Sequence, residues 1–178
     1  MSLLDKLKKA SSVKASEVLS KSKLFNKKDM ATTPVPILNV ALSGSIDGGL
    51  TSGLTIVAGP SKHFKSNLSL LMASAYMEKY PDAVCLLYDT EFGITPEYLK
   101  SMNVDPERVL HTPVEHVEQL KFDITKQLEN IERGDKIIIV IDSVGNLASK
   151  KELEDALDGK SVADMSRAKA LKSLFRIV

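Results

Sequence analysis

The chain has 178 residues, a mass of 19.5 kDa and 43% hydrophobic residues, which favours one compact domain over a multidomain enzyme. A net charge of +1 with 26% charged residues argues against both a disordered acidic chain and a uniformly basic nucleic-acid coat. The single cysteine, Cys85, excludes an internal disulfide and suits a reducing compartment. No apolar run approaches the roughly 20 residues that span a bilayer, and we find no signal-peptide stretch, so we expect a soluble, cytoplasmic protein.

Charge is concentrated in the N-terminal segment, residues 1–30, which holds eight lysines and three carboxylates and therefore a net charge of +5. The remaining residues carry −4, so we place a boundary near residue 30. Apolar residues at helical spacing predict two short helices with lysines on the opposite face: Leu3, Leu4 and Leu7 in the first, and Val18, Leu19 and Phe25 in the second. The segment is either a helical hairpin with a solvated face or an arm that docks on a neighbouring subunit or DNA. The prolines and glycines of residues 31–53 predict an irregular, structured loop region.

Beyond residue 53 the pattern alternates between strands and helices. We predict strands at 54–58, 83–88, 108–111 and 136–141, and helices at 66–79, 96–102 and 115–133. Apolar runs in strands that alternate with helices indicate an α/β fold with a parallel sheet and right-handed crossovers. A ligand site is then expected at the carboxyl ends of the strands.

The strongest local motif lies where that rule places a ligand, between the strand predicted at 54–58 and the following helix. It reads Gly59-Pro60-Ser61-Lys62-His63-Phe64-Lys65-Ser66, which matches GxxxxGK[ST] except that Phe64 replaces the second glycine. Backbone N–H groups of such a loop surround a phosphate, the lysine neutralises β- and γ-phosphate charge, and the hydroxyl binds Mg²⁺. A basic strand-to-helix turn is the alternative. Phe64 is a real departure, because a residue with a Cβ fits a left-handed or crowded position poorly.

Carboxylates follow two of the other predicted strands. Asp142 ends the apolar run 137–141 as a Walker B acid would, although an ordinary turn aspartate at a strand end is the alternative. Glu91 follows the strand predicted at 83–88, where it could orient and deprotonate the water that attacks the γ-phosphate. Asp89 competes for that role, and either carboxylate could simply cap the turn.

These motifs together resemble a known family. GPSKHFKS, YDTEFGITPEYL, VDPERV and IIIVIDS, with LFNKKD, NVALSG and LASKKELEDAL around them, are similar to the RecA-type recombinases. The resemblance is closest to the UvsX strand-exchange proteins of large tailed phages, in which Phe also precedes the phosphate-loop lysine. It implies a RecA-like P-loop NTPase core with a mostly parallel central sheet over residues 31–178. It also implies that residues 1–30 are a helical oligomerisation segment.

The resemblance further implies roles for individual residues, with ATP and Mg²⁺ as the cofactors. Glu91 and Lys65 would be catalytic, Ser66 and Asp142 would bind the metal, and Tyr98 would stack on adenine. Residues 59–66 would hold the phosphates. The alternative for Tyr98 is half-buried packing of its own helix.

The same resemblance assigns residues 155–161 to a first DNA-binding loop, with Lys160 and Arg167 as phosphate contacts. From the residues alone this stretch reads as a solvated loop, because it contains two aspartates and no aromatic residue. The family continues beyond the helix expected at 162–178 with another strand, a polar sensor and a second DNA-binding loop. We therefore expect this chain to be an N-terminal portion whose core is incomplete at its C-terminus.

The implied function is that of a DNA-dependent ATPase that pairs and exchanges homologous strands. The implied partners are single-stranded DNA and further copies of the chain in a helical filament, with a recombination mediator and a single-strand binding protein as others. A phage-encoded protein would act in the cytoplasm of its host cell. Two alternatives remain open: another RecA-fold motor such as a hexameric helicase, and a non-catalytic fragment that binds nucleotide or docks on other subunits.

Overall fold

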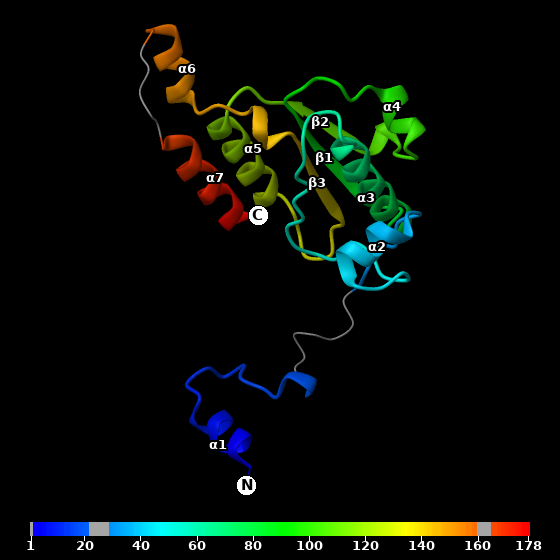
Figure 1. Ribbon diagram of the computed structural model, residues 1–178, viewed down its shortest axis with the longest axis vertical. Coiled ribbons are helices and arrows are strands. Elements are labelled where there is room, and N and C mark those ends of the chain that lie inside the picture. The colour runs from blue at the N-terminus through cyan, green and yellow to red at the C-terminus, as the bar shows by residue number, and fades with distance from the viewer. Residues whose placement is uncertain (1, 22–28, 160–164) are drawn as a thin grey trace.

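A three-stranded parallel sheet in the order β2-β1-β3 organises the structure (Figure 1). The computed structural model describes residues 2–21, 29–159 and 165–178. The strands are β1 (Val84–Asp89), β2 (Val109–Pro113) and β3 (Ile137–Asp142). β1 is central and is almost wholly buried, which explains its continuous apolar sequence.

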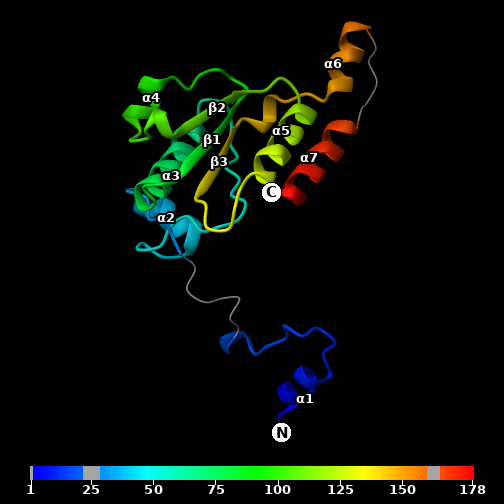
Figure 2. The same ribbon diagram turned by 180° about the vertical axis from the view of Figure 1, so that it is seen from behind.

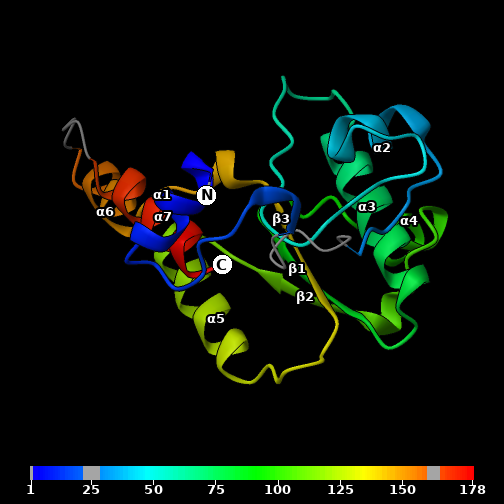
Figure 3. The same cartoon turned by 90° about the horizontal axis from the view of Figure 1, so that it is seen from below.

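Helices cover both faces of this sheet. Side chains alternate between the faces of a strand, so Cys85 and Leu87 of β1 join one buried cluster, while Leu86 and Tyr88 join the other. The first cluster is completed by α3 (Lys65–Lys79) and α4 (Pro96–Ser101), and the second by α5 (Val117–Glu129) and α7 (Ser166–Ile177). Figure 3 shows α2, α3 and α4 on one side of the sheet and α5 with α7 on the other. The predicted α/β class with a parallel sheet is confirmed.

The remaining helical elements connect these layers or precede them. They are α1 (Leu3–Ala10), η1 (Leu19–Lys21), α2 (Pro36–Ser43), η3 (Pro106–Arg108), η4 (Val144–Asn146) and α6 (Lys150–Leu157). The views from the front and from behind show α1 outside the layers of the α/β core (Figures 1 and 2). None of the helices in the described part of the chain combines the length and the apolar character that crossing a bilayer requires.

Two sequence predictions about regular structure are wrong. Residues 36–43 form helix α2 rather than a loop, because Pro36 occupies the first helical turn, where its missing N–H costs nothing, and Gly44 closes the helix with φ 76°. Residues 54–58 form no strand, and all except Val57 are exposed. A strand forms only through pairing with a neighbour, and no described strand is paired with this segment.

Other boundaries differ by a few residues. The helix predicted at 115–133 ends at Glu129, where Asn130 rather than Gly134 is the C-cap. In the N-terminal segment the first predicted helix is α1, whereas residues 19–21 form only a 3₁₀ turn. Phe25 lies outside the described residues.

Candidate nucleotide-binding site

The register of the sheet gathers the predicted site residues at one edge. Asp89 at the end of β1 lies opposite Asp142 at the end of β3, so the residues that follow the two strands emerge side by side. The backbone N–H of Thr90 donates to the carbonyl of Asp142 at 2.8 Å. The side chain of Thr90 accepts from the N–H of Ser143 at 2.9 Å. These bonds tie the segment that carries Glu91 to the segment that carries Asp142.

The loop before α3 has a left-handed backbone at Phe64, the position where the motif normally has a glycine. Phe64 is the N-cap of α3 and takes left-handed dihedrals, φ 56° and ψ 21°, and Lys62 also has a positive φ of 64°. A left-handed backbone at a residue with a side chain destabilises the fold by of order 1 kcal/mol. Here that residue is Phe64, whose side chain is 73% exposed. Lys65 Nζ donates to the carbonyl of Pro60 at 2.7 Å. The lysine therefore folds back over its own loop.

Ser66 and Asp142 form the direct link between this loop and the sheet. Ser66 Oγ donates to Asp142 Oδ2 at 2.6 Å, and Asp142 is only 9% exposed. A hydroxyl and a carboxylate are the hard oxygen ligands that Mg²⁺ prefers, usually with phosphate oxygens and water completing the shell. No group of three or more acidic, histidine or cysteine side chains forms a metal site within the described ranges. The donors fit a magnesium ion that is shared with a nucleotide.

Glu91 is exposed, but its carboxylate is held. Oε1 accepts a hydrogen bond from Ser143 Oγ at 3.1 Å and one from Asn146 Nδ2 at 2.9 Å. Sequence reasoning missed both donors. Ser143 could have been found, because it directly follows the predicted strand-end acid. Asn146 gives no signal in the sequence, because only the 3₁₀ turn η4 brings it back toward Glu91.

Asp89, the alternative to Glu91 as the base, is buried, whereas Glu91 is exposed. Asp89 is 1% exposed, and its Oδ1 accepts from the backbone N–H groups of Glu91 at 2.9 Å and Phe92 at 2.7 Å. Its Oδ2 lies 3.1 Å from His111 Nε2. Asp89 is thus a buried cap of the turn, whereas Glu91 faces the strand-end edge.

Tyr98 lies partly buried on α4, packed against the first core cluster. Its backbone N–H is capped by Thr95 Oγ1 at 3.2 Å. Burial, and secondarily the negative charge of Asp142, raises the pKa of the phenol. Its stacking on adenine stays a prediction.

The predicted DNA contacts fare differently. Arg167 on α7 is partly buried and donates through Nη2 to the carbonyls of Val144 at 3.2 Å and Gly145 at 2.9 Å. Lys160 lies outside the described residues. The first part of the loop predicted at 155–161 belongs to α6, which continues to Leu157. A phosphate contact at either residue stays a prediction.

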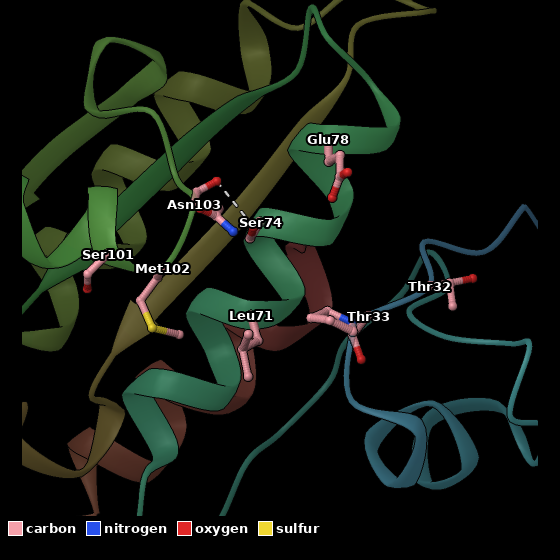
Figure 4. A pocket seen from close by; sticks show the side chains of 9 residues that line it. Thr32, Thr33, Leu71, Ser74, Glu78, Ser101, Met102 and Asn103 are labelled. Carbon is pink, nitrogen blue, oxygen red and sulfur yellow. Dashed lines mark hydrogen bonds between the residues drawn. The ribbon is translucent and has the colours of Figure 1, made fainter.

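A cavity of about 330 Å³ has a lining of its own (Figure 4). It is bounded by residues 32–34, one face of α3 and residues 101–103. Ser74 Oγ donates to the carbonyl of Asn103 at 3.2 Å across it. None of the predicted site residues lines this cavity, so the sheet edge, and not the cavity, is the candidate site.

These features together define the architecture of a P-loop nucleotide-binding protein. They are a parallel sheet between helices, a phosphate-type loop before the helix that starts at Lys65, and a strand-end aspartate beside Ser66. The family model described as RecA N-terminal domain matches residues 4–177. The chain belongs to this family.

Similar proteins agree with that assignment. The chain is 62% identical over 176 residues to a protein of Enterobacteria phage T4 named "Recombination and repair protein", covering 99% of this chain and 45% of that protein. It is 31% identical over 135 residues to Protein RecA of Sulfurimonas denitrificans, covering 74% of this chain and 37% of that protein. It is 30% identical over 155 residues to Protein RecA of Bartonella tribocorum, covering 83% of this chain and 43% of that protein. The resemblance to RecA-type recombinases is confirmed, and the chain spans less than half the length of these relatives.

Proposed function

We propose that this chain is the nucleotide-binding portion of an ATP-dependent DNA recombinase. The observation that carries the proposal is the contact between Ser66 and Asp142, with Glu91 tied to the same strand end. The name of the T4 relative, "Recombination and repair protein", supports the same class of function. We place the protein in the cytoplasm, that of the host cell if a phage encodes it.

In this proposal the phosphates of ATP occupy the loop of residues 59–66. Lys65 leaves the carbonyl of Pro60 and donates to the β- and γ-phosphates, where its full charge makes strong hydrogen bonds. Ser66 and Asp142 hold Mg²⁺, which neutralises phosphate charge when bound. Glu91 accepts the proton of the attacking water, and Tyr98 contacts the adenine.

Assembly and DNA binding extend the proposal to the rest of the chain. Leu3, Leu4 and Leu7 of α1 are 72%, 55% and 59% exposed, which leaves an apolar face that packing on a neighbouring copy would bury. Residues 1–30 would thus join copies into a helical filament on single-stranded DNA, with Lys160 and Arg167 at phosphates. A recombination mediator and a single-strand binding protein would be further partners.

Nucleotide binding tests the core of the proposal. A fluorescent ATP analogue should bind the purified chain in the presence of Mg²⁺, and Lys65→Ala should lose most of that affinity. Lys126→Ala is the matched control, because Lys126 is paired with Glu129 on the surface of α5, away from the loop of residues 59–66. Equal binding by the Lys65→Ala and Lys126→Ala variants would refute the phosphate-loop assignment.

A further inference from the structure

The turn after β3 connects Glu91 to helix α7. Asn146 Nδ2 and Ser143 Oγ both donate to the same oxygen of Glu91, at 2.9 and 3.1 Å. An exposed glutamate loses conformational entropy when it is ordered, so it is mobile unless specific contacts hold it. Two donors on one oxygen select a single orientation and leave Oε2 as the oxygen that can accept a proton.

Both donors depend on a short piece of backbone. Ser143 is the N-cap of η4 and Asn146 is its last residue, and η4 is a 3₁₀ turn of only three residues. Such a turn has little stability of its own, because its hydrogen bonds are few and poorly aligned. Its position must therefore be set by contacts with other elements.

Arg167 supplies such contacts. Its Nη2 donates to the carbonyls of Val144 and Gly145, which lie between the two residues that hold Glu91. α7 itself is anchored, because Leu174 is fully buried in the cluster that it forms with α5. Arg167 thus fixes the position of η4 relative to the anchored helix α7.

The guanidinium faces the protein. Arg167 Nε is buried and finds no acceptor in the described part of the chain, although a buried donor without a partner is destabilising. An arginine that served only to contact a solvent-exposed phosphate would avoid this cost by extending outward. Its inward position favours a role toward the turn.

We propose that Arg167 is a positioning residue for Glu91, acting through residues 143–146. This inference rests on the proposed function of Glu91 as the general base. It gives Arg167 a role in the absence of DNA, in addition to the phosphate contact that the family resemblance implies. Asn146 is the residue through which that role reaches the carboxylate.

The first test measures the order of the Glu91 side chain by ¹³C relaxation in the full chain. Arg167→Ala and Asn146→Ala should each increase its mobility. Arg176→Ala is the control, because Arg176 is an exposed arginine of the same helix. Asn146→Asp keeps the size of the residue but places a carboxylate against Glu91, so it should also increase the mobility of the Glu91 side chain. Thermal melts identify any variant that fails to fold.

The second test measures single-turnover ATP hydrolysis without DNA, with ATP affinity measured separately. Arg167→Ala and Asn146→Ala should slow hydrolysis by about 10- to 100-fold, as expected for a misplaced catalytic group, and leave affinity unchanged. If Arg167→Ala weakens only DNA binding and leaves the order of Glu91 and DNA-free hydrolysis unchanged, the inference is overturned. If the unmodified chain neither binds nor hydrolyses ATP, the proposed function fails, whereas the relaxation experiment still decides whether Arg167 positions Glu91.

Discussion

Ser66 at the start of α3 donates a 2.6 Å hydrogen bond to Asp142 at the end of β3, although 76 positions separate them in the chain. Lys65 is the immediate neighbour of Ser66, and Glu91 is tied to the residue after Asp142. These two contacts together bring three separate sequence motifs to a common edge.

The Ser66 to Asp142 contact should matter before and after nucleotide binds. Ser66→Ala leaves a nearly buried carboxylate without this donor, so we expect urea denaturation to show a loss of about 1 to 3 kcal/mol. Asp142→Asn keeps an oxygen that can accept from Ser66 but removes the charge, so it should abolish the gain in ATP affinity that Mg²⁺ produces. Glu129→Gln, an exposed carboxylate on α5, is the control. A Mg²⁺ effect that survives in Asp142→Asn would contradict the assignment of Asp142 as a metal ligand.

Glu91→Gln should separate binding from chemistry. The amide oxygen can still accept from Ser143 and Asn146, so the side chain keeps its place, but it no longer accepts a proton. Hydrolysis should fall by about 10² to 10⁴, the usual contribution of a general base, with ATP affinity retained. Parallel losses of affinity and rate would instead make Glu91 a structural or metal-binding residue.

Asp89 should support the turn that carries Glu91. Asp89→Ala leaves the N–H groups of Glu91 and Phe92 without their acceptor, which we expect to destabilise the protein by about 1 to 3 kcal/mol. Hydrogen exchange at these two amides should accelerate. Asp105→Ala is a matched control, because Asp105 caps the N–H of Glu107 in the same way on an exposed turn. Equal losses of stability for the two substitutions would show that the burial of Asp89 does not increase its contribution to the free energy of unfolding.

Cys85 should be inert in the folded protein. The thiol is 1% exposed, and burial raises its pKa from 9.0 to about 12. The native state therefore keeps the proton that the unfolded state loses, so this group lowers the free energy of unfolding as pH rises from about 9 toward 12. Ellman's reagent should react with the chain only after denaturant is added. Rapid reaction at neutral pH in native buffer would show that β1 opens.

Helix α1 should mediate self-association without supporting the core. Leu4→Ser combined with Leu7→Ser removes apolar surface that is exposed in the single chain, so the melting temperature of the core should not change. Light scattering should show a loss of oligomers. Lys6→Ser with Lys9→Ser is the control on the same helix. A lower melting temperature for the leucine variant would mean that α1 packs on its own core.

Local patterns in the sequence determined the class of fold and the identity of the motifs. Apolar periodicity located the three strands and helices α3 and α5 to within a few residues, since burial of one helix face or of both strand faces leaves a direct trace in the residue order. The loop before α3 and the aspartate after β3 were recognisable for the same reason, because each motif is contiguous. The left-handed backbone at Phe64 was also foreseeable from the glycine that the motif normally has there.

Tertiary structure alone decided which residues meet. Whether residues 54–58 form a strand depends on pairing with a neighbour, which their own sequence does not encode. Glu91 and Asp89 are equivalent carboxylates in the sequence, but the register of β1 with β3 buries Asp89 and directs Glu91 toward Ser143 and Asn146. Arg167 likewise reaches η4 because α7 packs against α5, a contact between helices that are distant in sequence. Pairing and packing of distant segments are long-range properties, and they turned separate motifs into one site.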